Sequence, residues 1–416
     1  MTGRRRFLQS LTGGLGLAVA GCSRSDTTGT PSSRRTDVYT FADDVPDELR
    51  KRVYRVDDRL ESIVGRQPNR PTRIATVESE PTRGRSTISS FVDLLDTAQH
   101  VSPADTEFSG SLGWAGTHTD VDGQSQVTFR GDSIRDSLIA HELFHVIQAE
   151  VVGSVDRTGP SHDASKAAYA VKEGAAEYVE WIYDQQCRDG AFEPCKLPDR
   201  PSLSRVTPLV LARFGHPYFS GMGFIHAVYE RGGWAGVWDA HRAPPRSTAG
   251  ILEPERYASG GVDPSEPSVP YEAPEDWLAF ERTRVGVFAL YTKLFALDVV
   301  SLSDPAAAAP PSMRRRTGWS KQFDSQLLRG WQGDQFVGFG HLDSGDRMGY
   351  AWVIEWESPS AARDLAAAIE SGYDNRGTYR DGRWHLGETV VGIDLAGDRV
   401  TFTMAPDKES FDTIFS

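Results

Sequence analysis

Apolar residues recur every three or four positions in four stretches of the chain, and this spacing predicts helices that each bury one face. The predicted helices cover residues 47–65, 136–150, 163–186 and 218–233, and the last of them is expected to stop at a glycine pair. Shorter runs predict strands at residues 72–77 and 124–131.

The chain downstream of these helices is harder to divide. Residues 276–300 are apolar over most of their length, which predicts a long buried helix. The stretch before it, 255–275, is so rich in proline and glycine that we expect an irregular loop there. Residues 301–316 have the composition of a linker or surface loop.

The C-terminal residues follow a different pattern. They predict, in order, a strand, a helix with Ser358 as its N-cap, a hairpin near Ala396 and a short final helix. This β-α-β-β order is typical of a small ferredoxin-like α+β module. The expected fold class is therefore α+β, with a mainly helical body that contains a small sheet at residues 41–333 and a C-terminal module at 334–416.

The N-terminus carries the features of an export signal. An arginine triplet precedes an apolar, glycine-rich run at residues 11–21, which is too short to span a bilayer comfortably and ends in VAGC at Cys22. The arginines resemble a twin-arginine signal, and the ending resembles the motif at which lipoproteins are cleaved and lipidated. We expect a signal peptide at 1–21, a lipid on Cys22, a flexible tether at 22–40, and a location on the outer face of the cell membrane. The alternative is a secreted protein in which Cys22 is incidental.

The charge balance limits the choice of partners. The chain has 45 basic and 58 acidic residues and a formal net charge of −13 at pH 7. Residues 1–21 hold three of the basic residues and none of the acidic ones, so the mature chain is more acidic still. Arginine is much preferred over lysine, and acidic surfaces of this kind resemble those of salt-adapted proteins, in which salt screens the self-repulsion. The charge argues against nucleic acid as a partner.

The remaining cysteines, Cys187 and Cys195, form an even pair if Cys22 carries a lipid. In an oxidising compartment outside the cytoplasm we expect them to form a disulfide. A zinc site built on these cysteines is the alternative. It is disfavoured because the C-x-x-C spacing and a neighbouring histidine are both missing.

The stretch DSLIAHELFHVIQAE contains the motif H-E-x-x-H at His141, Glu142 and His145. Side chains four positions apart project from the same face of a helix, so the two imidazoles could bind one zinc ion. Glu142 could then act as general base toward a water molecule. From Ser137 to Gln148 the motif contributes the only charged or titratable residues, which makes the match more selective than four residues alone. The alternative is that the motif is accidental.

A third zinc ligand must come from elsewhere, because Val151 stands where the three-histidine class carries its last histidine. Glu173 and Glu177 lie four positions apart on one face of the predicted helix 163–186. Glu173 could bind the metal while Glu177 accepts a proton from a ligand imidazole. Gly174 costs the helix about 1 kcal/mol relative to alanine, and the small residues that follow it predict a close approach to a neighbouring helix. In so acidic a protein, both glutamates could instead be solvated surface residues.

Peptide hydrolysis through a tetrahedral oxyanion also needs a hydrogen-bond donor beside the metal. Three downstream residues are candidates for this role: Tyr218, Tyr257 and His226. Each of them could equally be a packing residue.

H-E-x-x-H on one helix and E-x-x-x-E on a later one resemble the gluzincins, the zinc metallopeptidases that include the thermolysin-like enzymes. The stretches HELFHVIQ, KEGAAEYVE and YFSGMGF are also similar to a group of twin-arginine-exported surface lipoproteins of halophilic archaea. The resemblance implies a zincin-like fold for the body and assigns each motif residue a role: zinc ligands His141, His145 and Glu173, general base Glu142, and supporting acid Glu177.

The function implied by the resemblance is that of a lipid-anchored zinc metallopeptidase acting on a peptide or protein substrate. Two alternatives stay open, a non-catalytic surface binding lipoprotein that keeps the zincin-like fold and a structural envelope protein. Neither the cleavage specificity nor the oligomeric state follows from the sequence.

Overall fold

The structure is a computed structural model of the chain that describes residues 37–77, 95, 98, 100, 116–121, 124–131, 134–153, 159–196, 208–261, 263–301 and 325–416. The expected signal peptide, Cys22 and most of the expected tether lie outside these residues, as does nearly all of the expected linker at 301–316. Within the described ranges, no helix is long and apolar enough to cross a membrane.

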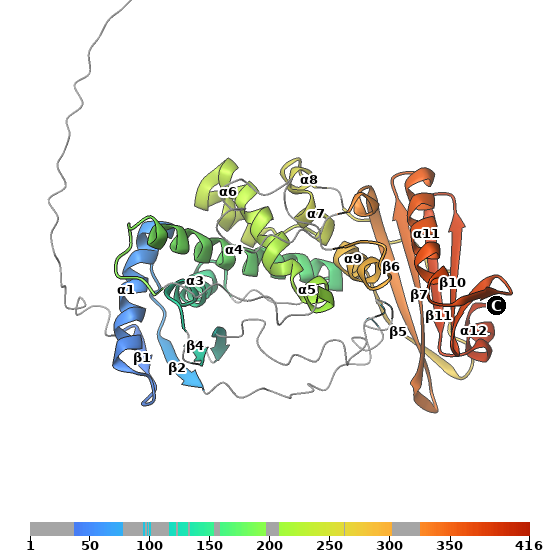
Figure 1. Cartoon of the computed structure of the whole chain (residues 1–416), viewed down its shortest axis with the longest axis horizontal. Helices are drawn as coiled ribbons and strands as arrows, with labels where there is room; N and C mark the ends of the chain where they lie inside the picture. Colours follow the sequence, from blue (N-terminus) through green and yellow to red (C-terminus); the bar gives the residue numbers. More distant parts are fainter. Residues whose placement is uncertain are drawn as a thin grey trace, which may run out of the picture.

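The described residues form a helical body with a small sheet and, beside it, a larger antiparallel sheet (Figure 1). The mixed helix and strand content expected from the sequence is confirmed. The small sheet has the strand order β1 (Tyr39–Phe41), β2 (Thr72–Val77), β4 (Gln124–Arg130) and β3 (Gly116–Val121). The first three of these run parallel, whereas β3 pairs antiparallel with β4 and forms the edge of the described sheet.

The body contains α1 (Asp47–Val64), α3 (Asp136–Val152), α4 (His162–Arg188), α5 (Pro208–Phe214), α6 (His216–Arg242), α7 (Thr248–Leu252), α8 (Pro254–Ala258) and α9 (Gly286–Ala296). The predicted helices in the first half of the chain are confirmed. α3 lies at the centre and contacts α1, α4, α6 and the small sheet. Every residue from Asp136 to Gln148 is buried. This burial on all sides explains why the helix carries so few charges in the sequence.

α4 crosses α6 at a contact between glycines. A Cβ added to Gly174 would lie 2.1 Å from the carbonyl carbon of Gly221, and one added to Gly221 would lie 2.2 Å from the oxygen of Ala170. Only residues without a side chain allow the two backbones to approach this closely. The close helix approach predicted from the small residues after Glu173 is therefore confirmed, and it fixes the part of α4 that carries Glu173.

The structure corrects three of the sequence-based boundaries. α6 does not stop at its glycine pair: Gly233 has non-helical dihedrals (φ 57°, ψ −155°) and kinks a helix that continues to Arg242. The predicted helix 276–300 is wrong in its first half, where β5 (Trp277–Thr283) pairs with a later strand. Gly286, at φ +79°, separates this strand from α9. Finally, the irregular stretch expected at 255–275 begins inside α8.

The larger sheet has the order β5, β6 (Trp331–His341), β7 (Ser344–Trp356), β11 (Arg399–Ala405), β10 (Thr389–Ala396), β9 (Arg383–Leu386) and β8 (Thr378–Arg380), and all its pairs are antiparallel. The short 3₁₀-helix η3 (Gln326–Leu328) precedes β6. The predicted strand, hairpin and final helix of this region are confirmed. The expected domain boundary between residues 333 and 334 falls inside β6, and β5 joins the sheet from before that boundary.

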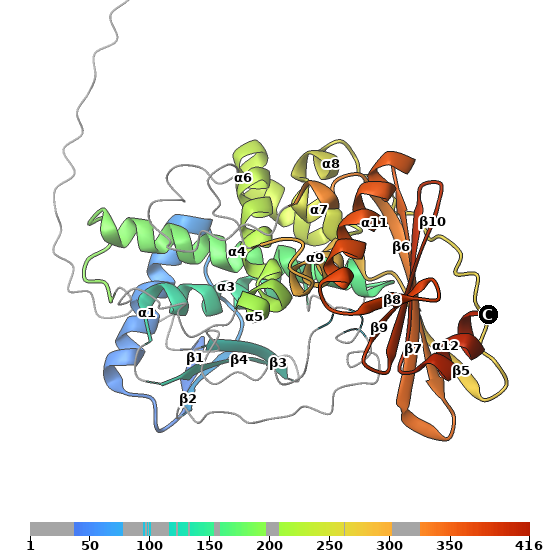
Figure 2. The ribbon, with the colours of Figure 1, turned by 45° about the vertical axis from the view of Figure 1, so that its right-hand side comes forward.

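Two helices cover opposite faces of this sheet (Figure 2). α11 (Pro359–Asp374) starts at Ser358, whose hydroxyl accepts a hydrogen bond from Ala361 N as predicted. It packs on the face toward the body and shares the main core with it. α12 (Lys408–Phe415) packs on the other face, over a separate cluster that includes Phe339 and Val353. The sheet is thus attached to the body through the α11 face and α9.

Lys293 of α9 lies at this junction and is fully buried. Its Nζ donates hydrogen bonds to Ala98 O at 3.0 Å, Tyr373 Oη at 3.0 Å and Tyr350 Oη at 3.3 Å. The amine also lies over the ring of Phe402, 5.2 Å from its centroid. Burial lowers the pKa of Lys293 to about 7, because the charged form loses its hydration.

Candidate metal centre

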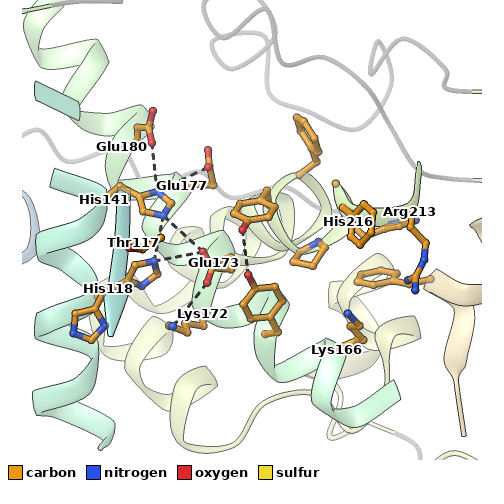
Figure 3. A pocket seen from close by; sticks show the side chains of 18 of the residues that line it. Thr117, His118, His141, Lys166, Lys172, Glu173, Glu177, Glu180, Arg213 and His216 are labelled. Carbon is orange, nitrogen blue, oxygen red and sulfur yellow. Dashed lines mark hydrogen bonds and ion pairs between the residues drawn. The ribbon is translucent and has the colours of Figure 1, made fainter. Parts of the chain in front are cut away.

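α3 and α4 bring the three predicted zinc ligands together, and Figure 3 shows two of them, His141 and Glu173, facing each other. His141 Nε2 and His145 Nε2 lie 3.2 Å apart. Glu173 Oε2 lies 3.4 Å from His145 Nε2 and 3.7 Å from His141 Nε2. All three side chains are buried. The helical spacing explains the histidine pair, and the glycine crossing of α4 and α6 helps to hold Glu173 opposite it.

These three atoms fit a zinc ion. Tetrahedral bonds of about 2.0–2.1 Å place neighbouring ligand atoms roughly 3.3–3.4 Å apart. The three measured separations of 3.2, 3.4 and 3.7 Å lie within a few tenths of an ångström of that spacing. Two imidazoles and one carboxylate are also the donor set of many catalytic zinc sites, which keep a fourth position open. The residues present could therefore hold zinc.

A chain of hydrogen bonds orients His145. Its Nδ1 lies 2.6 Å from Gln148 Oε1, an oxygen that can only accept, so the proton is on Nδ1 and the lone pair of Nε2 points to the site. The Gln148 amide is fixed in turn, since its nitrogen donates to Lys172 O at 2.9 Å and to His241 Nε2 at 2.9 Å. His241 accepts there because its Nδ1 donates to Val237 O at 2.8 Å.

A different partner orients His141. Glu180 Oε2 lies 3.3 Å from His141 Nδ1, and the other oxygen of Glu180 pairs with Arg135. The carboxylate predicted for this role, Glu177, lies farther away at 3.8 Å, beyond ordinary hydrogen-bond distance. Of the two acids, Glu180 is therefore the closer to His141, and Glu177, to which the supporting role was assigned, lies beside it.

The pKa values of the two acids follow from their neighbours. Burial raises the pKa of Glu180, but the charge of Arg135 and the contact with His141 outweigh burial and lower it to about 2. Burial and the adjacent Glu180 carboxylate raise the pKa of Glu177 to about 8. At neutral pH, Glu180 is therefore the ionised partner of His141, and Glu177 is largely protonated.

The centre surrounds its two imidazoles with four carboxyl groups, those of Glu142, Glu173, Glu177 and Glu180. Burial lowers the pKa of His141, but the nearby carboxylates of Glu173 and Glu180 outweigh burial, together with the charges of Glu142 and Glu177, and raise that pKa well above its usual range. Burial lowers the pKa of His145 and keeps it neutral, as a metal ligand must be. These carboxylates stabilise a positive charge on His141. An environment that stabilises a protonated imidazole is also suitable for a divalent cation.

Glu142 packs against β3. A Cβ added to Gly116 would lie 2.5 Å from Glu142 Oε1, so the glycine makes room for the carboxylate. The other oxygen, Oε2, is buried and has no hydrogen-bond partner among the described residues. Burial raises the pKa of Glu142 to about 7, although the charge of His141 opposes this. A buried carboxylate oxygen without a hydrogen-bond partner is available to accept a hydrogen bond from a water molecule or a substrate.

The centre opens into a cavity of about 270 Å³ lined by β3, α3, α4, the α5–α6 junction and α9. Of the three candidates for an oxyanion donor, only Tyr218 lines it. The Tyr218 hydroxyl lies 3.1 Å from that of Tyr169, which comes from α4. Tyr257 is not at the site, since its hydroxyl donates to Ala243 O at 3.0 Å. His226 contacts the Tyr178 hydroxyl instead, at 3.4 Å.

Four residues that support the ligands, Glu180, Gln148, Arg135 and His241, are not among the residues predicted from the sequence, although a sequence pattern indicates two of them. Glu180 continues the stripe of Glu173 and Glu177 at the next helical position, and Gln148 follows His145 by one turn on the same face. No sequence pattern indicates Arg135 or His241. Arg135 lies just before α3, and His241 reaches the centre from α6, which is distant in the sequence.

The disulfide between Cys187 and Cys195 is present, with the sulfur atoms 2.05 Å apart. It joins the end of α4 to the loop that follows, and Lys196 next to Cys195 bonds through its backbone N–H to Asp136 at the start of α3, at 3.1 Å. The loop closed by the disulfide therefore links the two helices that carry the centre.

Comparison with known proteins adds one match. Residues 278–414 match a family described as a domain of unknown function (DUF8575). The match covers most of β5, α9 and the larger sheet, and it begins after α3 and α4, so it does not include the candidate metal centre. No curated protein and no solved structure matches the chain.

Proposed function

We propose that the protein is a zinc metallopeptidase of the gluzincin type, held on the outer face of the cell membrane by a lipid on Cys22. The proposal includes a zincin-like relationship for the body and a ferredoxin-like one for the C-terminal sheet. The observation that carries it is the convergence of His141, His145 and Glu173 at separations that suit zinc, with Glu142 in the same cavity.

A zinc ion held by these residues would polarise the scissile carbonyl and make a nearby water molecule more acidic. Glu142 is the group positioned to take the proton from that water, since its free oxygen is buried in the cavity and bonded to no other described residue. The same carboxyl group can then donate the proton to the leaving amine. Gln148 holds the imidazole of His145 in the required tautomer, and the Glu180 carboxylate lies 3.3 Å from His141 Nδ1, close enough to support a proton on that nitrogen.

The hydroxyl groups of Tyr218 and Tyr169 complete the proposed chemistry. Burial first, and then the charge of Glu173, raise the pKa of Tyr218 far above its usual range, so its hydroxyl keeps its proton at any physiological pH. A neutral hydroxyl in a cavity next to the ligands can donate a hydrogen bond to a developing oxyanion. Tyr169 orients it across 3.1 Å.

A peptide is the substrate that the walls of the cavity suit best. Gly116, Thr117 and His118 of β3 line the cavity beside Glu142. β3 is the edge strand of the described sheet, and an edge strand can bind an extended peptide through its backbone groups. A peptide bound there would run past the metal ligands, which favours an amide as the bond to be cleaved.

The test is hydrolysis of an unfolded protein substrate by the zinc-loaded chain and by Glu142→Gln. We expect the variant to keep its zinc and to lose activity by about 10²- to 10⁴-fold, because only the proton acceptor is removed. The exposed Glu48→Gln on α1 is the control and should behave as wild type. Full activity in Glu142→Gln would overturn the mechanism. Zinc binding without any hydrolysis by the wild type would favour the non-catalytic binding protein instead.

The proposed location is tested separately by the mass of the N-terminal peptide of the mature protein. We expect Cys22 at the N-terminus with a lipid attached. An unmodified Cys22 inside the mature chain would refute this part of the proposal.

A further inference from the structure

The helix α9 and the residue that precedes it form one wall of the cavity beside the metal ligands. The residues of this wall are Val285, Phe288, Ala289 and Thr292. Positions with this spacing lie on one face of a helix, so they form a continuous surface, which we call the α9 face. In Figure 3, His216 lies on the side of the cavity away from His141, and the ring of Phe288 stacks on His216 with the ring centroids 4.2 Å apart. The α9 face therefore bounds the cavity on the side away from the zinc ligands.

Groups of the larger sheet hold α9 from its other side, and Figure 1 shows the helix between that sheet and α5. At the start of the helix, the backbone N–H groups of Val285 and Gly286 both donate to the buried carboxyl group of Asp334 on β6, at 2.8 Å each. Near its end, Lys293 donates to the hydroxyl of Tyr350 on β7 at 3.3 Å. Both ends of α9 are thus attached to the sheet.

The helical body restrains the same helix. The Thr292 hydroxyl donates to Ala212 O of α5 at 3.1 Å. Every residue from Gly286 to Leu294 is buried. A helix that is packed on both sides at the density of a protein interior does not move aside easily for a ligand. The α9 face is therefore a wall of fixed position, and its side chains determine how much room the cavity has in front of them.

α9 lies entirely within residues 278–414, the region that matches the domain of unknown function. The zinc ligands and Glu142 come from α3 and α4, which precede this region. Two parts of the chain thus build the cavity. The first part supplies the metal ligands, and the second supplies a wall without titratable side chains.

We propose that the matched region determines substrate specificity: the α9 face, at Phe288 and Ala289, sets the largest substrate side chain that the cavity admits. This inference rests on the proposed function, because it concerns the substrate of the same site. Ala289 has the smallest side chain of the α9 face and takes up the least room, whereas the ring of Phe288 occupies space beside it. A peptide side chain that packs here meets uncharged groups of α9, so its size decides the fit.

The experiment measures peptide binding to the zinc-loaded Glu142→Gln protein by fluorescence anisotropy, so that no turnover is needed. The probes are fluorescein-labelled glycine hexapeptides that carry alanine, leucine, phenylalanine or tryptophan at each of the two central positions in turn. Ala289→Val and Ala289→Leu fill the cavity in two steps. We expect Ala289→Leu to weaken binding of the phenylalanine and tryptophan peptides by about 10-fold or more relative to the alanine peptide, because one methylene group in an apolar pocket is worth about 10- to 200-fold. Ala289→Val should lie between Ala289→Leu and the parent protein.

Phe288→Leu tests the same wall in the opposite direction. It removes ring atoms, so the affinity for the tryptophan peptide should rise relative to the alanine peptide, by up to about 10-fold. Opposite shifts in the two kinds of variant do not arise from a general loss of structure. Ala296→Leu is the control, because Ala296 ends α9, is half-buried and does not line the cavity. It should bind all four peptides as the parent protein does.

An unchanged ranking of the peptides in both Ala289→Leu and Phe288→Leu, or no binding of any peptide, would overturn the inference. Its failure can be told apart from failure of the proposed function. The expected shifts in a protein whose wild type cleaves nothing would leave the inference standing and refute the peptidase. Cleavage by the wild type, with the same preference for residues beside the cleaved bond in Ala289→Leu, would do the reverse.

Discussion

Replacing Gly174 by alanine tests how the packing of α4 against α6 positions the centre. In an ordinary helix interior, alanine would stabilise the protein by about 1 kcal/mol relative to glycine. Here the added Cβ would lie 2.1 Å from the carbonyl carbon of Gly221, whereas contacting carbon atoms need about 3.5–4.0 Å. The neighbour is backbone and cannot rotate away, so the two helices must separate by roughly 1.5 Å.

The expected cost combines these two effects. Overpacking of a core costs about 1–3 kcal/mol, and a clash with backbone belongs at the upper end of that range. After the gain in helix propensity, we expect Gly174→Ala to lower the free energy of unfolding by about 2 kcal/mol. Glu173 directly precedes Gly174 and must move with the helix. Its displacement should weaken zinc binding roughly tenfold or more, as changes in the support of metal ligands do.

Both quantities can be measured on the same protein, by urea unfolding and by competition with a chromogenic zinc chelator. Gly223→Ala is the matched control, because Gly223 is in the interior of the partner helix α6 and a Cβ there would meet no atom within 4 Å. That variant should gain up to about 1 kcal/mol and bind zinc as wild type does. A Gly174→Ala protein as stable as the Gly223→Ala protein, with unchanged zinc affinity, would refute the reasoning.

Three further predictions concern residues outside the catalytic group. The pKa of Lys293 is lowered from 10.5 to about 7 in the folded protein. Between pH 7 and pH 10.5 the lysine is therefore protonated in the unfolded chain and neutral in the folded one. The free energy of unfolding should rise with pH in this range, by about 1.4 kcal/mol per pH unit. Wild type should therefore gain stability relative to Lys293→Met from pH 7 to pH 10, and a constant difference between the two proteins in urea unfolding would contradict this. Replacing Cys187 and Cys195 by serine should lower the free energy of unfolding by about 2–3 kcal/mol under oxidising conditions, since the disulfide closes a short loop. Gln148→Leu should weaken zinc binding about 10- to 100-fold. Gln148→Glu keeps an acceptor for His145 Nδ1 and should therefore retain most of the wild-type affinity for zinc.

Local patterns were enough to predict the helices that carry the centre. His141 and His145 share a face because of the helical period alone, and the absence of other charges around them reflects the burial of α3 on all sides. Glu173 could be proposed because the small residues after it indicated a close helix contact, which Gly221 provides. In each case, neighbours in the sequence determine the outcome.

The errors arose where distant segments decide the structure. β5 is a strand because it pairs with β6, more than forty residues later in the chain, and its apolar composition alone did not distinguish it from the start of a helix. Glu180 is the acid nearest His141 because Arg135, from the turn before α3, holds it there. Tyr257 is on α8, and its hydroxyl donates to Ala243 O instead of reaching the centre. No periodicity in the sequence reports such long-range contacts.

The most direct test of the metal centre is the zinc content of the folded chain after dialysis, measured by plasma mass spectrometry. The account predicts one zinc ion per chain in the wild type, retention of that ion in Glu142→Gln, and its loss in Glu173→Ala, because two histidines and water bind zinc poorly. A folded wild-type protein that takes up no zinc, or a Glu173→Ala protein that holds zinc as tightly as the wild type, would contradict it.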